Sequence, residues 1–279
     1  MQTNNKKREI FIYDGKDTMS AFKRTTHLGV FAHQDDTEFL AFHGILECYN
    51  AKDKFFSAVI VTDGAGNQRE GKYKNYTDAE MMDTRKSEQR KAAELGKYAT
   101  LTQLMHPSSE VKKGNDSVID DLYYILMLTK PQVIYTHNLA DKHDTHVATA
   151  LRLIEAIREM PKEIRPKIVL GCECWRDLDW MNDKDKIILD VSKNQELARS
   201  LADVFESQIE GVKNINRAIF GRRIANATFS VHNTDTTHST IAMDLTPLAH
   251  NDTLSIEDYI LSFIDKFSDD VAARLRKFK

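Results

Sequence analysis

Short apolar runs that stop abruptly at polar residues are the main feature of this sequence. Residues 28–32 end at the tetrapeptide HQDD, and residues 56–62 (FSAVIVT) end at DGAG. Continuous apolar runs of strand length are typical of parallel strands that are buried on both faces of a sheet. The same pattern predicts further strands at residues 133–136, 167–172 and 186–191.

Between these runs, apolar residues recur at the spacing of one helix face. In residues 116–129, Val118, Leu122 and Ile125 fall on one side, and Pro131 ends the pattern. Helices are predicted in the same way at residues 38–50, 85–98, 143–160, 193–209 and 256–278. Strands that alternate with helices favour an α/β fold with a doubly wound, mostly parallel sheet, helices on both faces and a C-terminal helical appendage.

Chain length and composition allow one large domain. Of the 279 residues, 41% are hydrophobic and 29% are charged, which permits a sizeable core. We expect an N-terminal extension over residues 1–25, a main domain over residues 26–232, and a linker with a last helix over residues 233–279. Residues 233–255 are polar and rich in Thr, which is typical of a loop, and the polar segment 67–83 is long enough to cover a site as a lid.

Charge and hydropathy exclude several classes of protein. The net charge of −3 and the lack of a dense basic stretch argue against nucleic acid as a partner. No apolar run reaches the ~20 residues of a membrane span, and the N-terminus lacks the apolar segment of a signal peptide. We therefore expect a cytoplasmic protein without a membrane span, and a homo-oligomer is compatible with this composition. The three cysteines lack the spacing of a zinc knuckle, so we expect them to be reduced and buried.

Three polar clusters follow directly after predicted strands. They are HQDD (33–36), DGAG (63–66) and HNLADKHDTH (137–146). Ligands of open parallel sheets bind beyond the carboxyl ends of the strands, so these clusters should meet at one edge. A catalytic zinc takes three nitrogen or oxygen ligands and keeps a fourth position for water, and His33, Asp36 and His146 supply such a set. The adjacent Asp35 would then point elsewhere and be free to accept a proton from that water.

Each of these features also has a simpler interpretation. Asp35 and Asp36 could cap the helix that follows them. The DGAG loop could bind a phosphate through backbone N–H groups, but a lone glycine pair without the Lys of a P-loop favours turn geometry instead. Arg69, in the predicted lid, is either solvated or grips a sugar. Trp175 and Trp180 either pack in the core or stack on a sugar ring.

The first and third clusters resemble the motifs of a known enzyme family. AHQDDTE (32–38) resembles the (A/P)HPDDxE motif of the PIG-L/LmbE-like N-acetylglucosaminyl deacetylases, and DKHDTH (141–146) resembles their DxHxDH motif. Four further segments resemble the family in the same order: RKSEQRKAAELG (85–96), GCECW (171–175), ILDVS (188–192) and GRRIANATF (221–229). The resemblance covers residues 26–230 and implies a Rossmann-like fold.

The resemblance also implies a reaction and a set of residues. His33, Asp36 and His146 correspond to the zinc ligands of the family, and Asp35 corresponds to its general base. His143 corresponds to the residue that polarises the oxyanion or protonates the leaving amine. The implied reaction is zinc-dependent hydrolysis of an amide, most often N-deacetylation of an N-acetylglucosamine conjugate, with one ion per chain, and other divalent ions suit the same ligands. Candidate substrate-binding residues are Arg69, Asp63 and Asp141.

Several positions depart from the pattern of the family. Gln34 replaces a proline, which should loosen the turn without removing a ligand. Asp144 and Thr145 replace the usual Pro-Asp pair, so the carboxylate that supports the catalytic histidine is displaced, and Asp144 or Asp141 would have to substitute. The substrate side of the pocket should also be unusual, because a frequent histidine and a glutamate of the family are replaced by Phe205 and Thr228.

Two other functions remain open from the sequence. A metal-dependent phosphoesterase would use similar ligands, but the extra carboxylates of a two-metal centre are lacking. A degenerate relative would bind a sugar without hydrolysing it, which the intact Asp35 argues against. One equivalent of zinc together with acetate release would separate the deacetylase from both.

Overall fold

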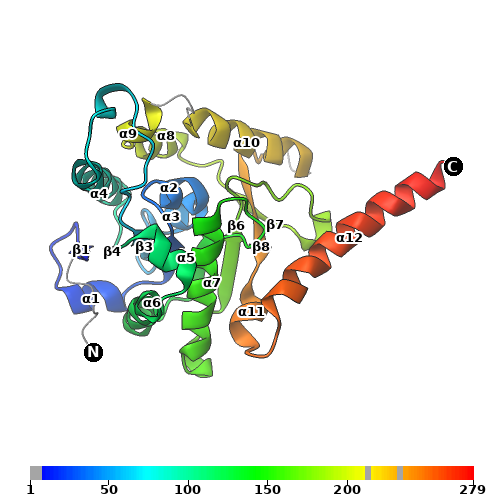
Figure 1. Cartoon of the computed structure of the whole chain (residues 1–279), viewed down its shortest axis with the longest axis horizontal. Coiled ribbons are helices and arrows are strands. Elements are labelled where there is room, and N and C mark those ends of the chain that lie inside the picture. The colour runs from blue at the N-terminus through cyan, green and yellow to red at the C-terminus, as the bar shows by residue number, and fades with distance from the viewer. Residues whose placement is uncertain (1–7, 211–214, 231–234) are drawn as a thin grey trace.

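An eight-stranded mixed sheet forms the centre of the protein (Figure 1). The computed structural model describes residues 8–210, 215–230 and 235–279. Five central strands are parallel, in the order β4 (Leu101–His106), β3 (Phe56–Thr62), β2 (His27–Phe31), β5 (Val133–His137) and β6 (Ile168–Cys172). Antiparallel strands complete the two sides, namely β1 (Glu9–Phe11) beside β4, and β8 (Ser239–Asp244) and β7 (Ile187–Asp190) beyond β6. The expected mostly parallel sheet is thus correct for the centre only.

Helices cover both faces of the sheet. Side chains of successive residues in a strand point to opposite faces, so Val59 and Val61 enter one core while Ala58 and Ile60 enter the other. One core packs against α1 (Thr18–Lys23), α5 (Ser108–Lys113), α6 (Asp116–Thr129), α7 (Asp144–Glu159), α11 (Thr246–His250) and the start of α12 (Ile256–Lys277). The other core packs against α2 (Asp36–Leu40), α3 (Phe42–Cys48), α4 (Asp78–Leu95), α8 (Gln195–Asp203) and α10 (Ile215–Ser230).

The order of the parallel strands reverses next to β2. After β2 the chain builds β3 and β4 on one side, and it then crosses to build β5 and β6 on the other side. Loops that leave the carboxyl ends of two such strands diverge, and the crevice between them is where ligands of this kind of sheet bind. The loops after β2 and β5 carry the first and third polar clusters of the sequence.

Most of the predicted elements are present, with shifted ends. Residues 56–62 and 116–129 form β3 and α6 with the predicted bounds. The helix predicted at 38–50 is instead two helices that meet at Ala41, because Arg223 donates to the carbonyls of Glu38 and Phe39 and these carbonyls no longer serve the next helical turn. The helix predicted at 193–209 is likewise divided into α8 and α9 (Glu206–Ile209).

The α4 helix begins seven residues before its predicted start. Its first residue is Asp78, because Thr77 and Glu80 form a capping box that satisfies the first free N–H groups. The second half of the predicted lid segment is therefore helical. The first half contains a short 3-10 helix, η1 (Gly71–Tyr73).

The prediction of a loop at residues 233–255 is wrong for its central part. Residues 239–244 form β8, which is inserted between β6 and β7, and α11 follows. Ser239 and Thr240 are buried in this strand, and polar residues of this kind hid it from the apolar pattern. The sheet therefore continues beyond residue 232, where we expected the main domain to end. The N-terminal extension also contributes β1 and the buried Phe22.

The surface shows one unusual element. The α12 helix leaves the body of the protein and projects from it (Figure 1). Within the part of the chain that the structure describes, no helix combines the length and the apolar character needed to cross a membrane. Cys48, Cys172 and Cys174 are buried and free, as predicted.

Candidate metal centre

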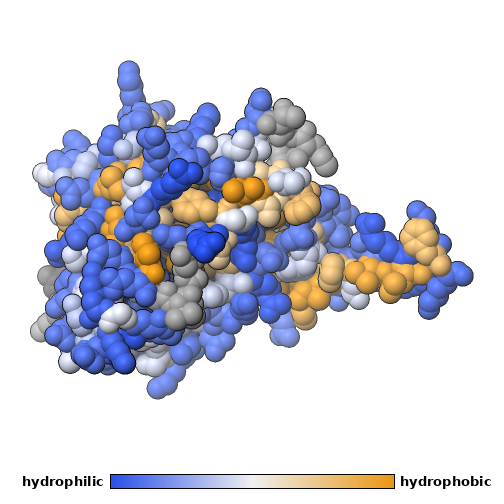
Figure 2. All heavy atoms as spheres, turned by 90° about the horizontal axis from the view of Figure 1, so that it is seen from above, coloured by the Kyte–Doolittle hydropathy of each residue, from blue (hydrophilic) through white to orange (hydrophobic). Residues whose placement is uncertain are grey.

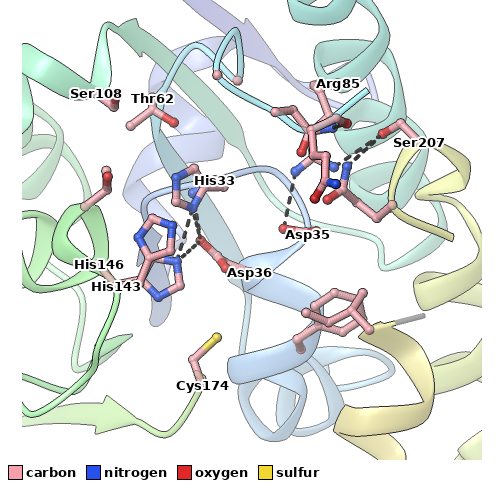
Figure 3. Close-up of a pocket in the computed structure, with 18 of the residues that line it drawn as sticks. His33, Asp35, Asp36, Thr62, Arg85, Ser108, His143, His146, Cys174 and Ser207 are labelled. Carbon is pink, nitrogen blue, oxygen red and sulfur yellow. Dashed lines mark hydrogen bonds and ion pairs between the residues drawn. The ribbon is translucent and has the colours of Figure 1, made fainter. Parts of the chain in front are cut away.

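The turn after β2 and the first turn of α7 bring His33, Asp36 and His146 together (Figure 3). His33 Nδ1 lies 3.2 Å from Asp36 Oδ2 and 3.1 Å from His146 Nε2. Asp36 Oδ2 lies 3.5 Å from His146 Nε2. Zinc with four ligands at ~2.0–2.1 Å holds neighbouring ligand atoms about 3.3–3.4 Å apart. The spacing of these three atoms therefore fits a tetrahedral zinc site.

The chemistry of the three atoms also calls for a cation between them. His146 Nδ1 lies 2.9 Å from the carboxylate of Asp141, which only accepts hydrogen bonds, so Nδ1 carries a proton. Although burial opposes it, Asp36 and Asp141 raise the pKa of His146, so a positive charge is favoured at Nε2. Burial would raise the pKa of Asp36, but His146 and the neighbouring His137 hold that pKa below its usual range. An ionised carboxylate thus faces two imidazole nitrogens, and a divalent ion suits this donor set.

Asp141 positions His146 instead of facing the cavity. Its Oδ2 contacts His146 Nδ1, and its Oδ1 accepts the backbone N–H groups of Lys142 and Arg176. A carboxylate behind a metal-binding histidine selects the tautomer and the orientation of the ring. Both oxygens are engaged inside the protein, which contradicts the predicted substrate contact of Asp141. Since it serves His146, it also does not replace the missing carboxylate of His143.

His137 lies beside the three atoms, but its lone pair is already used. Its Nε2 accepts the backbone N–H of Ala32 at 2.9 Å, so this nitrogen is unprotonated and occupied. Burial holds the pKa of His137 well below its usual range, and the ring stays neutral. The ring stacks on His146 with centroids 3.8 Å apart. His137 therefore supports His146 and does not extend the ligand set.

Asp35 stands next to the three atoms in a strained turn. Its backbone has φ +96° and ψ −32°, a conformation that costs a residue with a side chain about 1–3 kcal/mol. The α4 helix holds this turn. Gln89 Oε1 accepts the N–H of Asp35 at 3.1 Å, and the Arg85 guanidinium lies 3.4 Å from Asp35 Oδ1 (Figure 3). Arg85 also donates to the carbonyl of Gln34.

Burial gives two carboxyl groups of this turn unusual proton affinities. Burial raises the pKa of Asp35 to about 7, although the Arg85 guanidinium counteracts the rise. A carboxylate with a pKa near 7 can accept and release a proton at neutral pH. Burial likewise raises the pKa of Glu38 to about 8, and its Oε1 accepts the amide of Gln89 at 2.8 Å. Gln89 thus links the backbone of the turn to Glu38.

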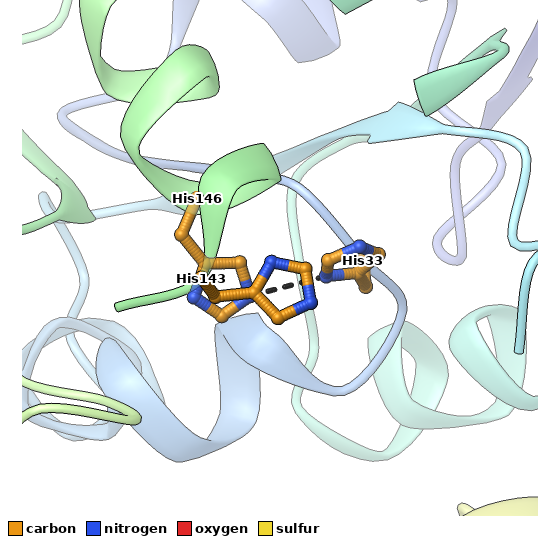
Figure 4. A group of neighbouring side chains, drawn as sticks. All are labelled: His33, His143 and His146. Carbon is orange, nitrogen blue, oxygen red and sulfur yellow. Dashed lines mark hydrogen bonds between the residues drawn. The ribbon is translucent and has the colours of Figure 1, made fainter. Parts of the chain in front are cut away.

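His143 lies beside His33 and His146, but fewer contacts hold its ring than hold Asp35 (Figure 4). Its ring stacks on His146 with centroids 4.3 Å apart and lies 6.4 Å from the Trp175 ring. Within the described residues, His143 Nδ1 is buried and has no hydrogen-bond partner. Burial and the nearby histidines lower the pKa of His143 to about 4, so the ring is neutral at pH 7. Asp144 is exposed on α7 and leaves this nitrogen unpaired.

A cavity of about 330 Å³ opens over these residues (Figure 3). Its floor contains His33, Asp35, Asp36, His143 and His146. Its polar walls are formed by Asp63, Asn67, Gln68, Glu70, Ser108 and Gln208. This volume is at the lower end for small-molecule sites, and the carboxylate and amide groups suit the hydroxyl groups of a small polar ligand.

The other two candidate substrate-binding residues, Asp63 and Arg69, differ in their position relative to the cavity. Asp63 lines the cavity, and its Oδ1 accepts the N–H of Ala65 at 3.0 Å. The guanidinium of Arg69 contacts the carbonyl of Ala65 and the carboxylate of Asp78, so it braces the loop and does not contribute to the cavity wall. Asn67, Gln68 and Glu70 supply part of the wall, and the action of this segment as a lid stays a prediction.

The departures from the family motifs have different consequences. Gln34 is fully buried and donates to the carbonyl of Thr62 at 3.2 Å. A side chain at Gly64, which has φ +75°, would meet Gln34 Oε1 at 2.7 Å. The turn at Gln34 is therefore tightly packed against the loop at Gly64, whereas we expected the loss of proline to loosen it. Phe205 is buried against Phe39, with ring centroids 6.3 Å apart, and Thr228 is exposed.

The sequence motifs alone did not reveal how α4 supports the site. Arg85, Glu88 and Gln89 are all buried and lie on one helix face, at the i, i+3 and i+4 positions. Glu88 accepts the N–H and the hydroxyl of Ser207, which ties α4 to α9. The polar and charged residues at this spacing were the signal in the sequence for a supporting role of α4, since a helix rarely buries such residues without partners.

The family match covers the candidate site. Residues 28–157, which include His33, Asp36 and His146, match the PIG-L family model, described as GlcNAc-PI de-N-acetylase. This match confirms the family resemblance that the motifs predict. No curated protein matched the chain.

Solved structures with a similar fold include deacetylases and a hydratase. The N,N'-diacetylchitobiose deacetylase from Pyrococcus horikoshii is 16% identical with a TM-score of 0.64, and the match covers 84% of this chain and 88% of that chain. A 4-carboxy-2-hydroxymuconate hydratase from Pseudomonas putida is 16% identical with a TM-score of 0.59, covering 79% and 96%. A zinc-inhibited form of a teicoplanin deacetylase is 14% identical with a TM-score of 0.57, covering 79% and 97%. At these identities the likeness concerns the fold alone.

Proposed function

We propose that this relative of the PIG-L family is a zinc-dependent hydrolase that deacetylates an N-acetylglucosamine-containing small molecule or glycoconjugate. The observation that carries the proposal is the meeting of His33 Nδ1, Asp36 Oδ2 and His146 Nε2 within 3.1–3.5 Å of one another at the floor of a polar cavity. We propose one zinc ion per chain, and other divalent ions suit the same ligands.

Each residue around the candidate metal site would have a separate role in the reaction. A divalent ion held by His33, Asp36 and His146 lowers the pKa of water and polarises a carbonyl group. Asp35 accepts the proton of the attacking water as the bond to the carbonyl carbon forms, and it returns the proton to the nitrogen as the carbon–nitrogen bond breaks. His143, with a neutral ring, donates a hydrogen bond to the oxyanion that develops on the former carbonyl oxygen.

The cavity supports a sugar as the substrate. Asp63, Glu70 and Gln208 are acceptors or donors that suit hydroxyl groups, and Trp175 offers an aromatic surface at the same wall. Among the described residues that line the cavity, Arg85 is the one arginine or lysine, and its guanidinium is buried against Asp35 and Glu88. This arrangement favours a neutral polyhydroxylated group at the described walls over a phosphate ester.

The alternative functions receive less support from the site. A two-metal phosphoesterase needs a second ligand set, and the lone pair of His137 that a second ion would require is occupied by Ala32 N–H. A sugar-binding protein without activity would not need the strained backbone of Asp35. The fold is shared with a hydratase as well as with deacetylases, so the activity has to be tested directly.

The test combines metal analysis with acetate release from a panel of N-acetylglucosaminides. We expect about one zinc ion per chain and acetate release that a chelator abolishes and added zinc restores. His146→Ala should lose most of the metal, while His143→Ala, which changes a nearby histidine that we do not assign as a ligand, should keep it. Full metal retention in His146→Ala would remove this residue from the site. Hydrolysis of phosphate esters without acetate release would replace the proposed reaction.

A further inference from the structure

The second half of α12 carries an apolar surface that the described part of the chain does not cover. The first half of the helix packs on the body through Ile260 and Phe263. Further along, Lys266 contacts Asp185 and the Phe267 ring lies 6.4 Å from the Trp180 ring. Beyond this point the helix projects outward (Figure 1), and its surface is a band of apolar side chains among charged ones (Figure 2).

The exposed apolar residues of this half form one stripe. Ile264 and Phe267 are each 41% exposed, Val271 is 39% exposed, Leu275 is 63% exposed and Phe278 is 83% exposed. With ~100° between successive residues of a helix, the other four lie within about 40° of Val271. Isolated helices of this length are marginal in water, and a contiguous apolar stripe at a projecting element is typical of an interaction surface.

The stripe is symmetric about Val271, which identifies its partner. Ile264 and Phe278 are both seven residues from Val271, and Phe267 and Leu275 are both four residues from it. When two copies of the helix run antiparallel with Val271 facing Val271, Ile264 of each copy faces Phe278 of the other, and Phe267 faces Leu275. A stripe with this symmetry is complementary to itself, as the contact of a two-fold dimer must be.

The charges beside the stripe obey the same symmetry. Asp270 and Arg274 lie on one flank of the stripe, about 100° and 60° from Val271 around the helix, and form an ion pair of 2.8 Å within the helix. In an antiparallel pair related by a two-fold axis, this flank lies beside the same flank of the other copy, so Asp270 of each copy comes close to Arg274 of the other. In a parallel pair it would lie beside the opposite flank, where Ser268 and Ala272 offer no matching charge.

We propose that α12 forms an antiparallel two-helix contact with α12 of a second copy of this chain, centred on Val271. The acidic residue beside the stripe disfavours an anionic membrane surface as the occupant, since the carboxylate of Asp270 would be repelled there. One helix pair is a small interface by the ~1,600 Å² standard, so the dimer should dissociate reversibly on dilution.

Sedimentation velocity of the full chain over a concentration series tests the proposal. The wild-type mass should rise with concentration from 32.0 kDa to twice that value. Val271→Asp places two carboxylates at the symmetry axis and should keep the protein at 32.0 kDa. Ala273→Asp is the matched control, because it adds the same charge to the opposite, exposed face of the same helix, and it should dimerise as the wild type does. Circular dichroism and thermal unfolding confirm that both variants are folded.

Charge reversal tests the orientation of the two helices. Asp270→Arg and Arg274→Asp should each weaken self-association about tenfold or more, since each creates two like-charge contacts across an antiparallel pair. The double variant restores opposite charges at both contacts and should dimerise again. A parallel pair would respond to neither single change in this way.

A cysteine cross-link gives an independent readout of the same geometry. A mixture of Ile264→Cys and Phe278→Cys proteins should form a mixed disulfide under mild oxidation, while each protein alone should not. The native cysteines are buried and do not interfere. A chain that stays monomeric at all concentrations overturns the proposal. So does a stripe that binds vesicles of phosphatidylserine and phosphatidylcholine without self-association, or a cross-link formed by either single-cysteine protein alone.

Discussion

The two groups on either side of the metal-site residues, Asp35 and His143, are supported in very different ways. Asp35 is held at its backbone by Gln89 and at its carboxylate by Arg85, both from one rigid helix. His143 is held by ring stacking on His146, and within the described residues its Nδ1 has no hydrogen-bond partner. Hydrogen bonds define both the position and the proton affinity of a group, whereas stacking defines little more than the plane of a ring.

This difference indicates which group the reaction depends on most. The turn at Asp35 stores about 1–3 kcal/mol of backbone strain, and such strain persists only where the surrounding contacts enforce it. The donor at His143 lacks the carboxylate partner that the family motif supplies, so it acts as a neutral ring and gives a weaker hydrogen bond than an imidazolium would. We therefore expect the losses to be larger on the Asp35 side.

Removing the carboxylate of Asp35 should give the largest effect. Asp35→Asn keeps the size of the side chain but cannot accept a proton, so kcat should fall by about 10³-fold or more, within the 10²–10⁴ range of general-base catalysis. Metal content should stay at the wild-type value. Asp63→Asn changes another carboxylate of the same cavity and should alter KM more than kcat. Near wild-type turnover in Asp35→Asn would assign the base to another carboxylate.

Removing the ring of His143 should give a smaller loss. A single donor to a developing oxyanion contributes 10²–10³ in kcat, and a neutral donor belongs at the lower end, so His143→Ala should lower kcat by roughly 10²-fold. Zinc content and KM should be nearly unchanged, because the contact tightens only in the transition state. A loss of zinc in His143→Ala would instead make His143 a ligand, since its ring nitrogen lies within 4.8 Å of those of His33 and His146.

The sequence predicted the meeting of His33, Asp36 and His146 better than it predicted the contacts that hold Asp35. His33, Asp36 and His146 follow two strands whose carboxyl ends meet at the point where strand order reverses, so apolar runs and residue types were sufficient to bring them together. The support of Asp35 depends on a helix about fifty residues away in the sequence. The residues around Gln89 in the sequence do not predict which turn its side-chain amide contacts.

The elements that the sequence did not predict share a physical cause. Residues 239–244 form a strand inside the sheet, but its buried residues Ser239 and Thr240 are polar, and Asn226 donates to the backbone carbonyl of Ser239. Asp141 was a candidate substrate-binding residue, whereas its Oδ2 lies 2.9 Å from the far nitrogen of His146. Both cases depend on tertiary hydrogen bonds, which local periodicity does not encode.

Weakening the support of Asp35 without touching its carboxylate sharpens the comparison. Gln89→Leu leaves the N–H of Asp35 without its acceptor and removes one of the donors to Glu38 Oε1, which keeps the Tyr98 hydroxyl, and this should lower the free energy of unfolding by about 1–3 kcal/mol. The turn should also become less well defined, so kcat should fall by about tenfold while KM and zinc content change little. Gln89→Glu keeps an acceptor for the N–H and should recover most of kcat. Equal kcat in all three proteins would show that the strained turn needs no such contact.

Restoring a carboxylate beside His143 should have the smallest effect and tests the weaker side directly. Thr145 is buried and lines the cavity, at the position where the family motif has aspartate. A negative charge near the ring favours its protonated form, so Thr145→Asp should raise the pKa of His143 above its value of about 4. A protonated ring still donates, but its positive charge beside the metal-site residues opposes the binding of a divalent ion, so activity should be lost when pH falls through this pKa. The acid limb of the kcat profile should therefore move upward, by about one pH unit or more.

The pH profile of kcat, together with an NMR titration of His143, measures this shift. Asp144→Asn is the matched control, because Asp144 is the adjacent carboxylate on the exposed side of α7, and removing it should leave the acid limb in place. A limb that moves in Asp144→Asn would mean that Asp144 already supports His143 from a distance. An unchanged profile in Thr145→Asp, combined with full activity in His143→Ala, would show that this histidine only packs against His146, and the site would then depend on Asp35 and the metal-site residues alone.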